Sequence, residues 1–173
     1  MNENEKHKLI QHLESLASEN NLDRSALAKL RRALYDPIEA YPVILPYLPK
    51  DINDYELNLY TLLAALFSIH PHSSSDGNMG LHMHRAAGEE IEATERRFVN
   101  LLRANWEDLP VLLRQSVSFL RSKEIAINWE QLRKDLLAWN HIDGYVQKSW
   151  ARAFWGYQPQ KAQSENEDKE LKK

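Results

Sequence analysis

The sequence contains no cysteine, only five glycines among 173 residues, and no long apolar run. The absence of cysteine excludes disulfides and thiolate chemistry. No apolar stretch approaches the roughly 20 residues that cross a bilayer. The opening MNENEKHKLIQHL also lacks the apolar core of a signal peptide. We therefore expect a cytoplasmic protein without a membrane segment.

Recognisable catalytic motifs are also missing. The chain has no G-x-S-x-G nucleophile turn, no glycine-rich phosphate loop and no H-E-x-x-H zinc motif. We therefore expect no enzymatic activity and no cofactor.

The pattern that dominates the sequence is helical. Hydrophobic residues make up 43% of the chain, and they recur at three- and four-residue spacing rather than in alternation. Asn53 with Glu56, and Asn128 with Gln131, have the spacing of a helix N-cap and its partner. The sequence therefore predicts an all-α protein, a helical bundle of two packed halves. Its expected helices lie at 5–20, 24–35, 54–69, 89–104, 109–122, 129–139 and 143–155.

Two segments interrupt these helices. The stretch 36–54 carries four prolines, which no long helix accommodates, and HPHSSSDGNMG at 70–80 has the composition of a loop. We place short turns at 40–48 and 81–86, and a short extended piece at 124–129. The predicted division is an N-terminal helical half at 1–80, a C-terminal helical half at 81–157 and a disordered tail at 158–173.

The charged residues are distributed unevenly along the chain. The formal net charge is −3, yet all eleven arginines lie between Arg24 and Arg152. Residues 24–156 contain 16 basic and 16 acidic side chains. A basic surface can therefore arise only if the two signs separate onto different faces.

The helix expected at 24–35 shows such a separation. At about 100° per residue, Leu27 and Leu30 fall on one side, whereas Arg31 and Arg32 fall on the solvent side. No acid occurs in this segment, although an ordinary solvated helix face mixes charge signs. An ordinary solvent face and a cationic binding face are equally good interpretations of this helix alone.

Later helices repeat the pattern. Arg96 and Arg103, like Arg114 and Arg121, are seven residues apart and share a helix face. Several acids that offset their charge are expected at helix starts, where they complement the helix dipole. Arginine suits phosphate binding because its planar group donates two hydrogen bonds to one phosphate. The candidate nucleic-acid-binding residues are Arg24, Lys29, Arg31, Arg32, Arg96, Arg97, Arg103, Arg114, Arg121, Lys148 and Arg152.

The histidines raise the question of a metal. His70, His72, His82 and His84 form two H-x-H pairs around Asp76, but their spacing matches no standard site. We expect a polar loop with partly exposed imidazoles and no bound metal.

Acidic and aromatic residues near the C-terminus also have structural interpretations. Glu130 and Asp135 flank Arg133 and Lys134 and are expected to form salt bridges. Four tryptophans could stack on bases, but their helical spacing favours core packing. They are Trp129, Trp139, Trp150 and the more ambiguous Trp155.

Six segments occur in a characteristic order within residues 22–156: ALAKLRRAL, LLAALFSIHP, GNMGLHMHR, ATERRFVNLLRANWEDLPVLLRQSVSFL, INWEQLRKDLLAWN and WARAFW. In this order and spacing they resemble the CasB family, the small subunit of the type I-E CRISPR surveillance complex called Cascade.

The resemblance implies a non-enzymatic, two-part helical protein that contacts the hybrid of guide RNA (crRNA) and target DNA and helps to hold the displaced strand. Its implied partners are a second copy arranged head to tail, the backbone repeat subunit and the large subunit of the complex. It assigns nucleic-acid contacts to Arg31, Arg32, Arg96, Arg97, Arg103 and Arg114. The alternative from the residues alone is a protein-only helical adaptor whose basic faces bind acidic partner proteins.

Overall fold

The computed structural model describes residues 6–156, which form nine α-helices and two short 3-10 helices and contain no β-strand. The all-α prediction is thereby confirmed. Within this range no helix combines the length and apolarity needed to cross a membrane. The predicted tail at 158–173 lies outside the described residues. The elements are α1 Lys8–Leu16, α2 Arg24–Arg32, η1 Pro37–Ala40, α3 Tyr41–Ile44, η2 Leu45–Tyr47, α4 Asp54–Ile69, α5 Met79–Ala87, α6 Ile91–Leu102, α7 Leu109–Ser122, α8 Trp129–Leu137 and α9 Tyr145–Trp155.

Side-chain caps set several helix starts where the sequence predicted them. The Asn53 side chain accepts a hydrogen bond from the Glu56 backbone N–H at 2.9 Å, and Asn128 accepts one from Gln131 at 3.0 Å. Such bonds satisfy N–H groups that have no partner within the helix. Other helices are shorter than predicted; α2, for example, ends at Arg32 rather than 35. Apolar spacing predicts which residues pack into the core, but it does not predict where the backbone hydrogen bonds of the helix end.

The short turn expected at 81–86 is instead part of the nine-residue helix α5. Asn78 caps this helix by accepting a hydrogen bond from the Leu81 N–H. Gly80, a residue that suggested a loop, sits in the first turn of α5, where a Cβ atom would overlap the Trp150 carbonyl oxygen. Glycine therefore permits the close approach of two helices here, rather than a turn.

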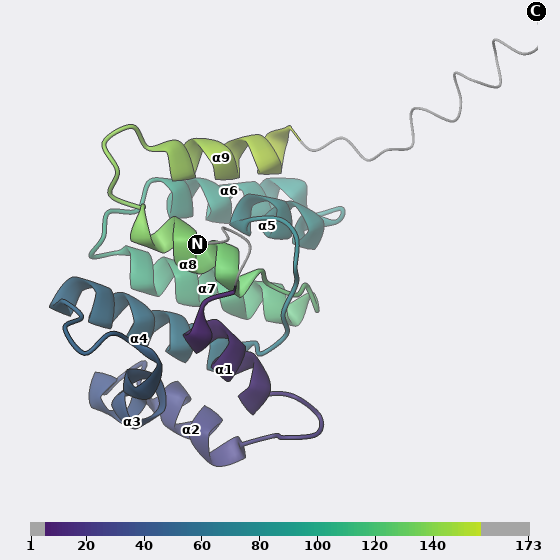
Figure 1. Ribbon diagram of the computed structural model, residues 1–173. Helices are drawn as coiled ribbons and strands as arrows, with labels where there is room; N and C mark the ends of the chain where they lie inside the picture. Colours follow the sequence, from purple (N-terminus) through teal and green to yellow (C-terminus); the bar gives the residue numbers. More distant parts are fainter. Residues whose placement is uncertain (1–5, 157–173) are drawn as a thin grey trace, which may run out of the picture.

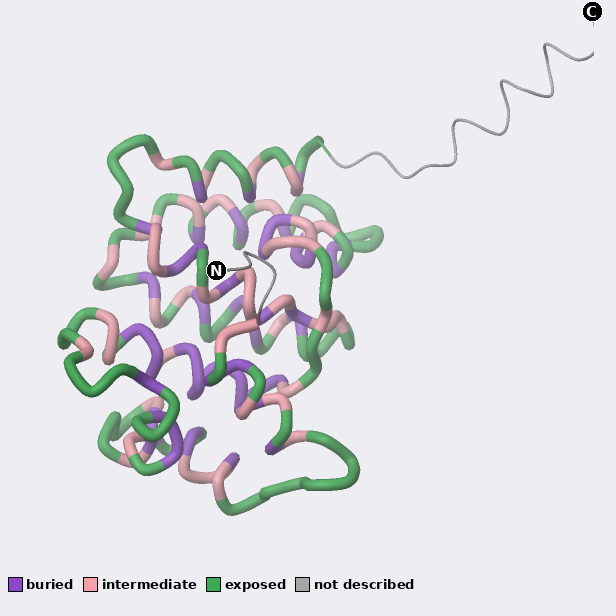
Figure 2. Tube along the Cα trace, in the orientation of Figure 1, coloured by how far each residue is buried: buried purple, intermediate pink, exposed green. Residues whose placement is uncertain are grey.

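The helices form two tiers that share one core. Figure 1 shows α1–α4 in the lower tier and α5–α9 in the upper tier. Helix α4 packs against α2 on one side and against α7 and α8 on the other, and Figure 2 shows that most of α4 is buried. A single cluster of buried apolar residues extends from Leu9 to Phe154 and includes side chains of both tiers.

The predicted extended piece at 124–129 makes one contact of the β type. Ser73 and Ile127 form an isolated parallel bridge. The Ser74 N–H donates to the Ile127 carbonyl at 2.9 Å, and the Ile127 N–H donates to the His72 carbonyl at 3.1 Å. These bonds tie the loop after α4 to the segment between α7 and α8.

Candidate nucleic-acid interface

Helix α7 has a buried side and an acid-free polar side. Leu113, Val117 and Leu120 are fully buried, at the spacing that places them on one face. No Asp or Glu occurs from Leu109 to Ser122, so the exposed arc of the helix carries only positive and neutral groups. We call this arc, together with one flanking arginine from each of α2 and α6, the α7 face. Its residues are Arg31, Arg97, Val111, Arg114, Gln115, Ser118, Arg121 and Ser122.

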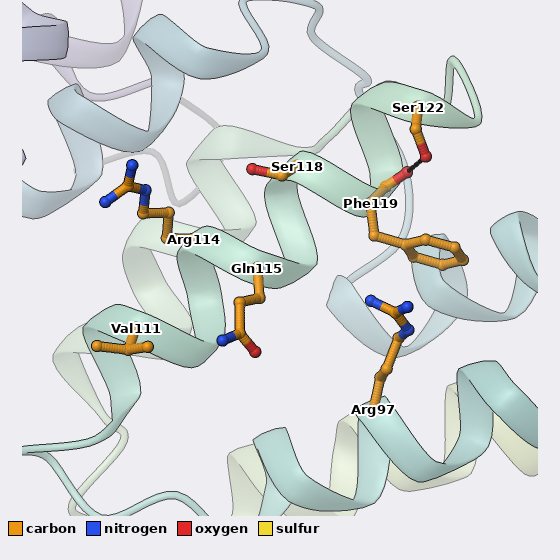
Figure 3. Close-up of a pocket in the computed structure, with 7 residues that line it drawn as sticks. All are labelled: Arg97, Val111, Arg114, Gln115, Ser118, Phe119 and Ser122. Carbon is orange, nitrogen blue, oxygen red and sulfur yellow. Dashed lines mark hydrogen bonds between the residues drawn. The ribbon is translucent and has the colours of Figure 1, made fainter.

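Arg97 is the residue that α6 contributes to the α7 face. Its guanidinium carbon lies 5.3 Å from the centroid of the Phe119 ring, within cation–π range, and the Lys123 ammonium lies 5.9 Å from the same centroid. Figure 3 shows Arg97 rising from α6 toward Phe119, and Gln115 turned toward α6. Arg114 points to the other side of α7. The residues of α6 and α7 enclose an open hollow of about 570 Å³.

Arg114 links α7 to the segment after α2. Its Nη2 donates a hydrogen bond of 2.6 Å to the Tyr35 hydroxyl, and its guanidinium carbon lies 5.1 Å from the Tyr35 ring centroid. Tyr35 is 77% exposed. A more apolar hollow of about 320 Å³, whose lining includes Pro37 and Trp106, also reaches Arg114. Arg114 therefore lies between two hollows, one lined by the consecutive helices α6 and α7 and one that also includes residues of α4 and the segment after α2.

Arg121 and Arg31 lie near the C-terminal end of α7. Both line a hollow of about 650 Å³ that also includes residues 69–72 and Glu124. The Arg31 Nη2 donates to the Ser68 carbonyl at 3.0 Å, near the end of α4, where the helix dipole favours a cation. This bond uses one of the five N–H donors of a guanidinium group.

The other cations predicted on α2 lie off the α7 face. Arg31 and Arg32 are both exposed while Leu27 and Leu30 are buried, which confirms the predicted orientation of this helix. Arg32, however, forms a salt bridge of 3.0 Å with Glu39 of η1. The absence of acids within α2 concealed this partner, because it comes from the next element. Of the two remaining cations, Arg24 is exposed at the start of α2 and Lys29 lines a different hollow, beside α1.

Helices α6 and α9 present further predicted cations. Arg96 and Arg103 line a hollow of about 500 Å³ on the other side of α6, together with Glu92 and Glu95. Two acids line this hollow, whereas one acid, Glu124, is found across the two hollows that hold the four arginines of the α7 face, so the potential is less positive here. The remaining two, on the solvent side of α9, are Lys148 and Arg152.

The sequence did not predict three residues at this surface. Gln115 and Ser118 belong to the α7 face, and Tyr35 lies beside it. The acid-free stretch from 109 to 123 was a signal for the two α7 residues. Nothing in the local sequence signals the contact of Tyr35 with Arg114, because the two residues are 79 positions apart.

The two acids of α8 have different roles. Glu130 forms the predicted salt bridge with Arg133, at 2.6 Å. The same prediction for Asp135 is wrong: the residue is 7% exposed, and its carboxylate accepts hydrogen bonds from Trp150 Nε1 at 2.6 Å and from Gln131 Nε2 at 2.8 Å. Burial raises the pKa of Asp135. Helix packing therefore turned this carboxylate inward, away from solvent.

The tryptophans mostly build the core. Trp129, Trp139 and Trp150 are buried, as their spacing predicted, whereas Trp155 is 49% exposed. The Trp155 ring lies 5.5 Å from that of Phe98 on α6. It belongs to the α6–α9 contact rather than to the α7 face.

The histidines are divided between the core and the surface. His70 is buried, and its Nε2 lies 2.8 Å from the Ile125 carbonyl. His82 is 1% exposed, and its Nε2 accepts a hydrogen bond from the Asn128 N–H at 3.1 Å. Within residues 6–156 no group of three or more His, Asp and Glu side chains is arranged to hold a metal ion. His82 therefore acts as a neutral acceptor that joins α5 to the start of α8.

We expect His82 to make folding stability fall in mild acid. Burial, followed by the nearby Arg85 charge, lowers its pKa from 6.5 to about 4, so the unfolded chain takes up the proton first. The contribution of neutral His82 to the free energy of unfolding is complete above pH 6.5 and is lost as pH falls toward 4. The loss reaches about 2 kcal/mol at pH 5. His82→Gln, which keeps an acceptor but does not titrate, should flatten the pH dependence.

Urea denaturation at pH 7 and pH 5 measures this effect, with His72→Gln at an exposed position as the control. Equal losses of stability in wild type and His82→Gln between these two pH values would contradict the assignment.

Comparisons with known proteins agree on one family. The sequence model described as CRISPR-associated protein Cse2 matches residues 26–155. The CRISPR-associated protein Cse2 of Thermus thermophilus is 32% identical over 140 residues, which cover 76% of this chain and 79% of that protein. The crystal structure of CasB from Thermus thermophilus superposes with a TM-score of 0.73 at 27% identity, over 86% of this chain and 96% of that one. A chain of a structure described as a CRISPR RNA-guided surveillance complex shares the fold, with a TM-score of 0.68 at 23% identity over 84% of this chain and 87% of that one.

Proposed function

We propose that this chain, which belongs to the Cse2 family of CRISPR-associated proteins, is a non-enzymatic subunit of an RNA-guided surveillance complex and binds nucleic-acid backbones through its α7 face. The observation that carries the proposal is the convergence of Arg31, Arg97, Arg114 and Arg121, from three helices, on a surface whose central helix has no acid.

The chemistry of this surface favours phosphate over bases. Guanidinium groups bind phosphate oxygens in a fork geometry, and Gln115, Ser118 and Ser122 add neutral hydrogen-bonding groups beside them. Contacts of this kind give affinity and position without reading sequence. In RNA-guided targeting, base pairing reads the sequence, and protein contacts to the backbones tip a nearly balanced strand exchange.

The proposed partners follow from the family. They are the guide RNA and target DNA, including the displaced strand, the backbone repeat and large subunits, and a second copy of this chain. The other predicted cations would extend the surface: Arg24, Lys29 and Arg32 on α2, Arg96 and Arg103 on α6, and Lys148 and Arg152 on α9. A near-neutral total charge suits a subunit that also packs against protein neighbours, and we place it in the cytoplasm.

The test is target-DNA binding across a salt series by a complex reconstituted with the Arg114→Gln/Arg121→Gln variant. If each arginine contacts one phosphate, the slope of log K against log salt should fall by about 1.4–1.8. The loss should be equal for every guide sequence and smallest at high salt. Arg96→Gln/Arg103→Gln should have a smaller effect, because Glu92 and Glu95 line the same hollow.

The matched control is Lys50→Gln/Lys134→Gln, which removes the same charge from exposed positions outside the α7 face. An unchanged salt slope in the α7 variant, with unchanged thermal melting, would exclude phosphate contact there and favour a protein-only adaptor.

A further inference from the structure

Tyr35 lies beside the α7 face, in contact with Arg114, and its exposure has no evident structural reason. The residue is 77% exposed and does not belong to the buried apolar cluster. It lies between α2 and η1, where its backbone N–H donates to the Arg32 carbonyl at 2.9 Å. Burial therefore does not account for an aromatic residue at this position.

The Tyr35 side chain is nevertheless held in place. Arg114 donates to its hydroxyl at 2.6 Å, and the guanidinium carbon lies 5.1 Å from the ring centroid. A single guanidinium group leaves most of the ring open to solvent. The pair thus presents an orientated aromatic ring immediately beside a cation. A nucleotide can stack its base on the ring and place its phosphate against the cation.

We propose that Tyr35 stacks against an unpaired base while Arg114 and its neighbours on the α7 face hold the adjoining phosphates. This inference rests on the proposed function and narrows it to single-stranded nucleic acid at this position. Bases in a duplex are already stacked on each other, so the ring can reach one only where the strand is open. Every base has a π-face, and stacking of this kind therefore tolerates any sequence.

The test compares two labelled single strands of equal length, oligo-dT and an abasic oligomer, in fluorescence-anisotropy titrations of the full chain. Tyr35→Ala should weaken binding of oligo-dT about fivefold or more and leave binding of the abasic strand within twofold of wild type. Tyr35→Phe, which keeps the ring and loses the hydroxyl, should bind oligo-dT within twofold of wild type. Tyr145→Ala is the matched control, since Tyr145 is an exposed tyrosine on α9, outside the α7 face.

The outcomes separate this inference from the proposed function. An equal loss on both strands would overturn stacking and assign Tyr35 the role of positioning Arg114. No loss on either strand would exclude contact with Tyr35, with phosphate binding intact. If wild type bound neither strand in a salt-dependent manner, the proposed function itself would fail.

Discussion

Gly80→Ala is expected to destabilise the fold by about 3 kcal/mol. A methyl group at Gly80 would lie 2.7 Å from the Trp150 carbonyl carbon and would overlap its oxygen. Both of these Trp150 atoms belong to the backbone of α9, so no rotamer change can relieve the overlap. The variant can fold only if α5 and α9 move apart. These two helices, both in the upper tier (Figure 1), pack extensively against each other.

The direction of this stability change distinguishes helix packing from local helix propensity. In a helix, alanine is ordinarily favoured over glycine by about 1 kcal/mol, so local propensity predicts stabilisation at Gly80. The control is Gly144→Ala, where the backbone is left-handed at φ 57° but the nearest group, the Gln147 Oε1, is 3.6 Å away. Strain alone should cost that variant about 1–2 kcal/mol.

Urea denaturation of the two variants and wild type makes the comparison. A Gly80→Ala variant at least as stable as wild type would show that α5 and α9 do not approach each other in this way.

Trp150→Phe is expected to destabilise the fold by about 3 kcal/mol, because it leaves both a small cavity and a buried carboxylate without a donor. The Trp150 indole is fully buried and donates the 2.6 Å hydrogen bond to Asp135. Phenylalanine keeps the aromatic packing in part but removes the N–H. Asp135 would then retain only the bond from Gln131, at 2.8 Å.

A double-mutant cycle with Asp135→Asn isolates the hydrogen bond from the cavity. A neutral amide is less costly to leave without a donor than a carboxylate, so Trp150→Phe should be about 1–2 kcal/mol less harmful in the Asn background. Acid should have a similar effect. Since burial raises the pKa of Asp135, and the loss of a donor raises it further, the penalty of Trp150→Phe should shrink as pH falls and the carboxyl group takes up a proton.

Additive losses in the cycle, or a penalty that does not depend on pH, would show that Trp150 contributes only its volume. Denaturant unfolding of the four proteins at pH 7 and pH 4.5 provides both measurements.

The class of fold was accessible from the sequence because its causes are local. Three- and four-residue apolar spacing produced the stripes that are now buried, as in Leu113, Val117 and Leu120 of α7. Asn53 and Asn128 cap the helices that they were expected to begin, because a cap depends on residues within one turn. The family resemblance was also correct, since ordered motifs along the chain are a property of the sequence itself.

The composition of the candidate site was only partly accessible. The exposed side of α7 follows from the wheel of one helix, and so does the exposure of Arg31 and Arg32. The salt bridge of Arg32 with Glu39, and the separation of Arg96 from Arg97 onto two hollows, depend on where the next elements lie.

Tertiary structure alone decided three further features: the pairing of Tyr35 with Arg114, the burial of Asp135 beneath Trp150, and the role of Gly80 between α5 and α9. Each joins residues from separate segments of the fold, between 15 and 79 positions apart in the chain. Helical periodicity determines which side of an element is apolar, but many pairs of apolar sides can pack together. The polar groups and glycines at their edges acquire partners only when one packing arrangement is formed.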